Sequence, residues 1–396
     1  MLSTLPPLLL TSEPGSFAQK TFQTRIPRIV ENIIATNDYP AEIVAALRAL
    51  REEIVSGALQ LVREEADDQE FWNAQAREHL GKTWLDLPWY WAEAFFYRRV
   101  LGHTRYFQEG DFYHRDPFAP AKRTELQPNR APRAVNATLE QLPTDNARAF
   151  HALLHASLWG NRTDLSHLAI KRDAQSFADE RANLLMDDSA RVWEFLRGTY
   201  GHVDVICDNA GTELCFDLAL IDFLLRANLT REIILHLKPQ PMFVSDAMIQ
   251  DVLASLDAFG KSTAAELRQL AQRLARALNN GLLVLSDHPF WVTGFFFHDM
   301  PNDLRTTLAQ ASLVISKGDA NYRRLIGDCH WQPTTRFEDA VAHFPAPVVA
   351  LRTMKAELIV GLRAGAAERL RAQDAEWLVN GKRGVIQFAK LNLAKE

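Results

Sequence analysis

The sequence predicts an α/β protein, in which a helical N-terminal domain precedes a domain built on a doubly wound, mainly parallel sheet. Up to about residue 195, apolar residues recur at helical spacing, with few β-branched runs. From about residue 200, short runs of Val, Ile and Leu alternate with helix-like segments, which is typical of a parallel sheet covered on both faces. The 396 residues are enough for two domains, which we place at residues 1–195 and 196–396.

The N-terminal domain is predicted from segments with a repeated apolar face. Residues 42–65 and 89–101 each carry apolar side chains at helical spacing. The interval 101–132 interrupts this pattern with Gly, Pro, Asp and Arg, so we predict a long irregular connection there. We expect a connection of this length to be either mobile or functional.

Five apolar runs predict the strands of the second domain. They are VDVIC (203–207), EIILHL (232–237), LLVLS (282–286), SLVIS (312–316) and VVALR (348–352). Helix-like segments at 213–225 and 264–278 separate the first three runs from one another. Strands of this composition with helices between them predict parallel pairing and burial of both sheet faces.

Composition and charge exclude several classes of function. An apolar fraction of 47% and a charged fraction of 23% are those of a globular protein. The net charge of −5 argues against a surface built for nucleic acid or an anionic membrane, but it permits an anionic small substrate in a cleft. Neither the 3 Cys nor the 12 His have the spacing of a zinc site. With no apolar run of membrane-spanning length and no secretory signal, we expect a soluble cytoplasmic protein.

Polar residues follow the predicted strands, at the sheet edge where parallel α/β proteins collect ligands. These residues are Asp208 and Asn209, Lys238 and then Asp246, Asp287 and His288, Lys317 with Asp319, Asn321 and Arg323, and Arg352, Thr353 and Lys355. Taken singly, the Asp and Asn residues among them could simply cap the helices that follow.

The same residues also suit a site for a metal and a phosphate. Together, Asp208, Asn209 and Asp246 supply three oxygen ligands of the kind that a hard divalent cation prefers. Lys317 and Lys355 are either solvated surface lysines or phosphate ligands, and the sequence leaves both interpretations open.

Six stretches along the chain match a known family in order and in combination. They are SFAQKTFQTRIPRI (16–29), SLWGNRTDLS (157–166), DNAGTELCFDLALIDFLL (208–225), KPQPMFVSDA (238–247), ISKGDANYRRLIGD (315–328) and LRTMKAE (351–357). By these stretches the chain resembles the damage-control phosphatases, and within them the branch that includes sugar-phosphate phosphatases. The resemblance implies a helical N-terminal domain beside a Rossmann-like α/β domain, and a metal-dependent phosphomonoester hydrolase.

The resemblance also implies roles for individual residues. Asp208, Asn209 and Asp246 match the family's ligands for a divalent metal, usually manganese, cobalt or nickel, with magnesium also possible. Glu213 matches an acidic residue that faces the substrate, and the DANYR stretch matches a substrate-binding loop, here Asp319, Asn321, Tyr322 and Arg323. Lys355 closes the RTxK signature that begins at Arg352 and Thr353, and it matches the lysine that holds the substrate phosphate.

We therefore predict hydrolysis of small sugar phosphates, such as a fructose 1-phosphate-like or related damaged metabolite, by metal-activated water. Asp208, Asp246 and Lys355 are the predicted catalytic residues, and covalent attack by Asp208 is the weaker mechanism. The first alternative is an S-adenosylmethionine-dependent protein carboxyl methyltransferase, a role suggested for relatives. The turn DNAGTE, with one glycine, disfavours it. The second alternative is a metal-stabilised binding protein without catalysis.

Overall fold

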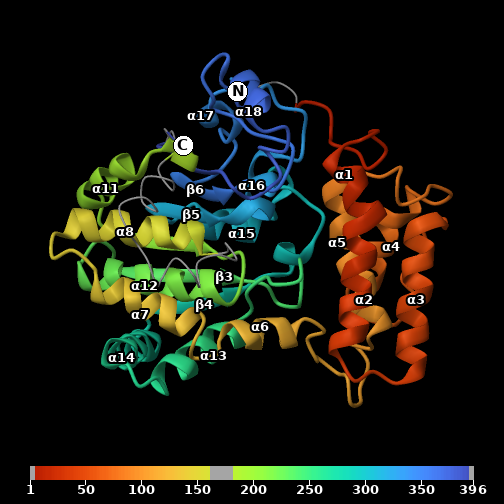
Figure 1. The fold of residues 1–396 in the computed structure, drawn as a ribbon, viewed down its shortest axis with the longest axis horizontal. Helices are drawn as coiled ribbons and strands as arrows, with labels where there is room; N and C mark the ends of the chain where they lie inside the picture. The colour runs from red at the N-terminus through yellow and green to blue at the C-terminus, as the bar shows by residue number, and fades with distance from the viewer. Residues whose placement is uncertain (1–4, 161–181, 392–396) are drawn as a thin grey trace.

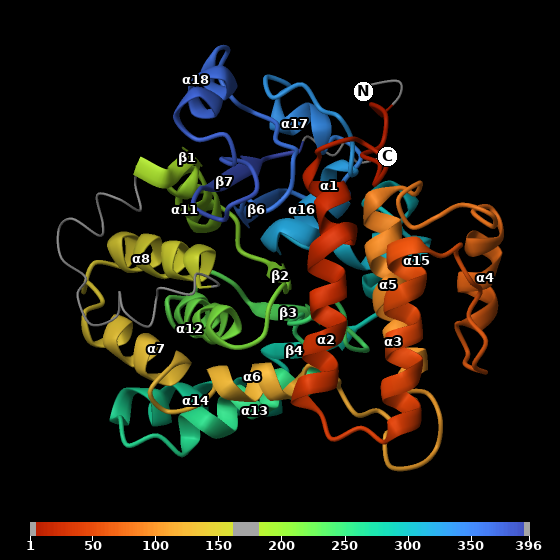
Figure 2. The same cartoon turned by 45° about the vertical axis from the view of Figure 1, so that its right-hand side comes forward.

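The computed structural model describes residues 5–160 and 182–391. The helices of residues 17–103 stand together beside the sheet, and those of residues 131–159 are layered on the sheet with helices from the second half of the chain (Figures 1 and 2). The first part of the chain forms α1 (Phe17–Lys20), a π-helical segment (Thr21–Arg25), α2 (Ile26–Thr36), α3 (Ala41–Ser56), α4 (Gln69–Arg77), α5 (Trp89–His103), α6 (Ala119–Glu125), α7 (Ala131–Glu140) and α8 (Asn146–Trp159). In the described residues, no helix is long and apolar enough to cross a membrane.

Two N-terminal predictions need correction. The helix predicted at 42–65 ends at Ser56, because Gly57 leaves the helical conformation while its N–H still binds Glu53 O at 2.8 Å. The connection predicted at 101–132 is not irregular throughout, since it contains α6 and the start of α7. The helix predicted at 89–101 is confirmed as α5.

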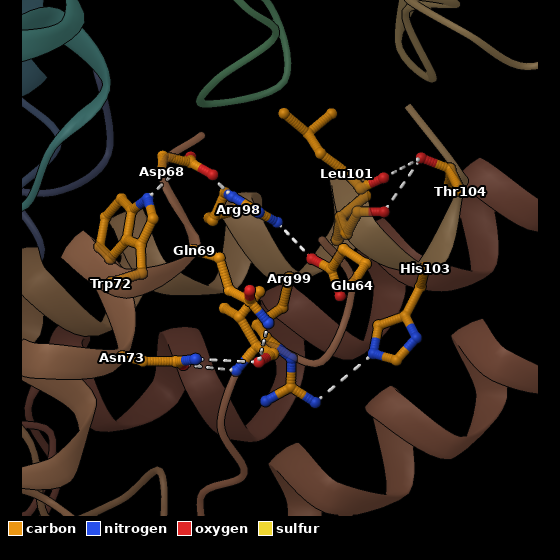
Figure 3. Close-up of polar contacts among 12 residues, drawn as sticks. Glu64, Asp68, Gln69, Trp72, Asn73, Arg98, Arg99, Leu101, His103 and Thr104 are labelled. Atoms are coloured by element: carbon orange, nitrogen blue, oxygen red, sulfur yellow. Dashed lines mark hydrogen bonds and ion pairs between the residues drawn. The ribbon is translucent and has the colours of Figure 1, made fainter. Parts of the chain in front are cut away.

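Buried polar side chains fix the segment between α3 and α4 (Figure 3). Asn73 binds both the N–H and the C=O of Val62, and Arg98 of α5 forms ion pairs with Glu64 and Asp68. Such contacts satisfy backbone groups that no helix or strand pairs. The segment is therefore ordered without regular secondary structure.

In the described part of the chain, seven strands form one sheet in the order β1-β7-β6-β5-β2-β3-β4. All neighbouring strands are parallel except β6 and β7. The strands are β1 (Leu184–Asp187), β2 (His202–Ile206), β3 (Glu232–Leu237), β4 (Leu283–Asp287), β5 (Leu313–Lys317), β6 (Val348–Thr353) and β7 (Gly384–Ala389). The five predicted strands are confirmed to within one residue at each end, and β1 and β7 were not predicted.

Alternate strand residues enter two different cores, which confirms burial on both faces. In β5, Leu313 and Ile315 belong to the core with α8, α12 and α14, whereas Val314 belongs to the core with the N-terminal helices. The second half of the chain supplies α11 (Ser189–Gly198), α12 (Thr212–Arg226), α13 (Ile249–Gly260), α14 (Ala265–Asn279), α15 (Asn302–Leu308), α16 (Gly318–Ile326), α17 (Phe337–Ala340) and α18 (Ala366–Gln373), with short 3₁₀ turns at Pro289–Val292 and Phe297–Asp299.

The predicted domain boundary at 195/196 implies that the two parts fold independently, and this stays a prediction. In the packing, β1 and α11 begin before residue 196 yet contact β7, and α8 packs on α12. The N-terminal helices share one hydrophobic core with the sheet face that contains Ile206 and Val314.

The strand order reverses between β2 and β5, so their carboxyl ends form the topological switch point of the sheet. Successive strands run from β2 to β3 and β4 on one side, and the chain then returns to place β5 on the other side of β2. Crevices at such points are where open α/β sheets bind ligands. The polar residues after β2 and β5 therefore lie where the fold favours a site.

Candidate active site

The loops after β2 and β3 bring the three predicted metal ligands together. Asn209 and Asp246 form an isolated antiparallel bridge. On either side of it, Ala210 N binds Ser245 O at 2.6 Å and Ala247 N binds Asp208 O at 2.7 Å. Two loops remote in sequence are thus held main chain to main chain.

The predicted ligands are almost completely removed from solvent. Asp208, Asn209 and Asp246 are 7%, 9% and 1% exposed. Burial raises the pKa of Asp208 well above its usual range, and the negative charges of Glu213 and Asp246 raise it further. Burial also raises the pKa of Asp246, although Lys238, whose Nζ lies 3.3 Å from Asp246 Oδ2, acts to lower it. A bound cation would stabilise both carboxylates in their charged form.

Asn209 determines whether this donor set fits a metal. Its Nδ2 donates to Asp208 Oδ2 and, at 2.9 Å, to Glu213 Oε2, while its Oδ1 accepts from Ser245 Oγ. Among the described residues, no group of three or more His, Cys, Asp or Glu is placed to hold a metal. In their chemistry, two carboxylates and one amide suit a hard divalent cation. To join them as a ligand, the Asn209 amide would have to turn its oxygen toward the carboxylates.

Gly318, at the junction of β5 and α16, allows Asp208 to occupy the switch point. Its φ is +84°, and a Cβ at this position would lie 2.0 Å from both Cγ and Oδ2 of Asp208. No side chain larger than hydrogen fits there unless Asp208 moves.

Lys317 is fully engaged within the protein. Its Nζ donates to Ser157 O at 2.8 Å, Glu213 Oε1 at 3.0 Å and Asp217 Oδ1 at 2.7 Å. Burial acts to lower the pKa of Lys317, but Asp217 and Glu213 outweigh it and raise that pKa. All three N–H groups of a permanently charged ammonium are used, so the predicted phosphate contact has no free donor in this arrangement.

Asp217 is a site residue that the sequence interpretation missed. It is buried, accepts from Lys317 and from Ser157 Oγ at 2.5 Å, and burial raises its pKa to about 6. The available signal was its position four residues after Glu213, on the same face of α12. Lys238 was seen at a strand end, but its ion pair with Asp246 was not predicted.

The RTxK segment wraps around an ion pair between the buried Arg352 and the partly buried Asp319. Asp319 Oδ1 accepts from Arg352 Nε at 2.7 Å and from Lys355 N at 2.9 Å, and Arg352 also donates to Leu358 O at 2.8 Å. Thr353 is buried beside them. Lys355 is half-buried, forms no ion pair with another described residue, and acts to lower the pKa of Asp208. Lys355 is therefore a cation near the predicted ligands with its ammonium available.

The rest of the predicted substrate loop points into the protein. Asn321 donates to Cys207 O and Lys317 O, and the Tyr322 hydroxyl donates to Gln387. Arg323 forms ion pairs with Asp328 of its own segment and with Glu93 of α5. The contacts of these three side chains go to other residues of the protein. That they also bind substrate stays a prediction. In the stretch predicted at 157–166, residues 161–166 lie outside the described residues.

A cavity of about 1090 Å³ lies near the ends of β3 and β4. His288 lines it, but none of the residues predicted to bind metal or substrate do. Its wall includes Glu65, Asp67, Asp68 and Asp299, and no Lys or Arg among the described residues. This charge disfavours a phosphate ligand. We therefore place the candidate site at the ends of β2 and β5, around Asp208.

Comparison with known proteins gives the family of the chain. Residues 21–370 match the model of the damage-control phosphatase ARMT1-like domain. The chain is 32% identical over 438 residues to the damage-control phosphatase ARMT1 of Danio rerio, covering 97% of each chain. It is 29% identical over 440 residues to the human protein of the same name, covering 98% of this chain and 99% of the relative.

A solved structure supports the fold alone. A DUF89 family protein from Pyrococcus horikoshii superposes with a TM-score of 0.51 at 15% identity, over 94% of this chain and 98% of that one. With the family model matching most of its length, this chain belongs to the damage-control phosphatase ARMT1-like family.

Proposed function

We propose that this protein is a metal-dependent phosphatase that hydrolyses small sugar phosphates, fructose 1-phosphate-like compounds among them, as in the sugar-phosphate phosphatase branch of its family. The observation that carries the proposal is the meeting of Asp208, Asn209 and Asp246 at the switch point, with the Lys355 ammonium nearby. A phosphate monoester needs an anion-binding group and a centre that activates water, and these residues supply the protein part of both.

Asp208, Asp246 and the Asn209 amide oxygen would hold manganese, cobalt, nickel or magnesium. When bound, such a metal lowers the pKa of a water molecule and polarises a phosphoryl oxygen. We assign the attack to water because Asp208 would already be bound to the cation as a ligand. Gly318 also lies directly against the Asp208 carboxylate.

Other side chains bind and orient the substrate in this proposal. Lys355 neutralises the phosphate oxygens, and its position is fixed because its backbone N–H binds Asp319. Glu213 orients a sugar hydroxyl or the attacking water. Its Oε1 accepts from Lys317 Nζ at 3.0 Å, so one of its two oxygens is fixed before substrate arrives.

The turn after β2 disfavours the methyltransferase alternative. A nucleotide-binding turn needs glycines so that the ligand can approach the backbone closely. Here the single glycine, Gly211, faces Glu125, whose Oε2 would lie 2.2 Å from a Cβ at that position. The space that glycine leaves is therefore taken by a side chain of the protein.

The test is a panel of sugar phosphates assayed on chelator-treated protein with each divalent metal added back. We expect turnover only with metal. Asp208→Asn, which keeps the shape and removes the charge, should lower kcat/KM at least about 100-fold, as expected for a metal ligand. Asp257→Asn, at an exposed ion pair with Lys261, is the matched control. Metal-independent turnover, or full activity of a folded Asp208→Asn protein, would refute the proposal.

A further inference from the structure

Helix α6 lies between the N-terminal helices and α13, within the interval that the sequence left as mobile or functional (Figures 1 and 2). Two of its charged side chains, Lys122 and Glu125, reach the two loops that carry the predicted metal ligands. Neither was singled out from the sequence. Their contacts go to different loops, so one short helix touches both halves of the site.

Lys122 binds the loop of Asp246. Its side chain is 5% exposed, and its Nζ donates to Asp246 O at 2.9 Å, while Asp251 Oδ2 and Asp116 Oδ2 lie at 2.9 and 3.0 Å. The carboxylates of Asp116 and Asp251 hold the Lys122 ammonium in place. Lys122 is therefore a fixed cation, and its third contact is the carbonyl of a predicted ligand.

The same ion pair anchors the far end of that loop. Asp251 Oδ2 also accepts from Met248 N at 2.9 Å, at the start of α13. Lys122 thus binds residue 246 directly and holds residue 248 through Asp251. The intervening main chain has little freedom to move Asp246 away from Asp208.

Glu125 binds the loop of Asp208 and Asn209. Its Oε2 accepts from Thr212 N at 2.9 Å and from Thr212 Oγ1 at 3.1 Å. The N-cap of α12 is Gly211, which has no side chain to satisfy these first N–H groups, so Glu125 supplies the acceptor from another helix. A carboxylate at a helix N-terminus is also favoured by the helix dipole.

We infer that α6 is a clasp that sets the spacing of the two ligand loops, with Lys122 and Glu125 as positioning residues for the metal. The inference rests on the proposed function. Both residues hold main chain next to the ligands and leave the donor atoms themselves unchanged. Loss of either contact should let the loops separate, so that binding a cation must order them again.

The test compares Lys122→Met and Glu125→Ala with Arg123→Met. Arg123 is exposed on the same helix, so its replacement removes the same charge as Lys122→Met without touching either loop. Manganese binding to chelator-treated protein is measured by titration calorimetry. We expect Kd to rise about 10–100-fold in the first two variants and to stay unchanged in Arg123→Met. Glu125→Gln keeps an acceptor oxygen and should recover most of the affinity.

Hydrogen exchange gives a second readout that needs no metal. The amides of Ala210 and Ala247, which join the two loops, should exchange faster in Lys122→Met and Glu125→Ala and at wild-type rates in Arg123→Met. If Lys122→Met does not fold, the comparison of Glu125→Ala with Glu125→Gln tests the inference on its own. If the wild type binds no manganese, the metal proposal fails and with it the role of Lys122 and Glu125 in positioning a metal, even where faster exchange shows that α6 holds the two loops. Unchanged Kd and unchanged exchange in folded variants would overturn the clasp.

Discussion

Gly318 links one backbone angle to the placement of a carboxylate that we propose as a metal ligand. Gly318→Ala meets two separate costs: the positive φ of +84°, about 1–2 kcal/mol, and the overlap with Asp208. Gly81 offers a matched control, because its φ is also +84° and nothing lies within 4 Å of its would-be Cβ. We expect both alanine variants to lose stability in denaturant, Gly318→Ala more than Gly81→Ala because of the overlap, but only Gly318→Ala to lose most of its metal-dependent activity.

The two readouts separate backbone strain from the site. Equal loss of activity in Gly81→Ala would mean that general destabilisation explains the effect. Wild-type activity in a folded Gly318→Ala protein would mean that Asp208 can move without consequence, which would contradict its assignment as a ligand.

At the residue scale, the sequence predicted which side chains follow the strands but not what they bind. Asp208, Asn209 and Asp246 do meet, because parallel strands end at one edge, and Lys355 lies near enough to Asp208 to act against the rise in its pKa. The sequence could not show that the three N–H groups of Lys317 donate to Ser157, Glu213 and Asp217, since those partners come from α8 and α12. Partners that meet only through tertiary packing leave no local pattern.

At the element scale, a strand could be predicted when its apolar run was unbroken. Strand β7 was missed because Gln387 interrupts its run, although that residue is buried and binds Val360 O and Tyr322. Strand β1 has four residues and ends in Asp187, too short a run to distinguish from a loop. Helix α6 was missed because its seven residues carry no extended apolar face.

Helix α5 shows how an element can make stability depend on pH. Near its end, His103 Nε2 lies 3.4 Å from Arg99 Nη2 (Figure 3). Burial, together with the charge of Arg99, lowers the pKa of His103 to about 4. A folded-state pKa below the unfolded value means that the unfolded chain binds the proton first. This residue's contribution is therefore present above about pH 6.5 and is lost as pH falls toward 4.

We expect His103→Gln to remove that dependence. The free energy of unfolding of the wild type, minus that of the variant, should fall by up to about 3 kcal/mol between pH 6.5 and 4. Denaturant unfolding at a series of pH values measures this difference. Parallel curves for the two proteins would show that His103 is not buried in its neutral form.

At the scale of the whole molecule, the two parts of the chain share a core. Phe22 and Val30 of the N-terminal helices belong to the same buried cluster as Val314 and Val348 of the sheet. Separate melting of the two parts would expose this apolar surface to water at an intermediate stage. We therefore expect both parts to unfold together, so that a ligand at the switch point stabilises the N-terminal helices too.

Metal binding tests this coupling in one thermal melt. A ligand that binds only the native state adds RT ln(1 + [L]/Kd), about 2.7 kcal/mol at a hundredfold excess over Kd, which is a few degrees of Tm for a chain of this length. Manganese or cobalt should raise the single transition of chelator-treated protein, and calcium should raise it less, because calcium prefers more oxygen ligands than two carboxylates and an amide supply. Asp246→Ala should abolish the shift, whereas Asp257→Ala, at an exposed ion pair, should preserve it. Two transitions, of which metal moves only one, would show that the two parts do not unfold as one cooperative unit. If no metal shifts the transition, the predicted ligands do not form a preformed metal site.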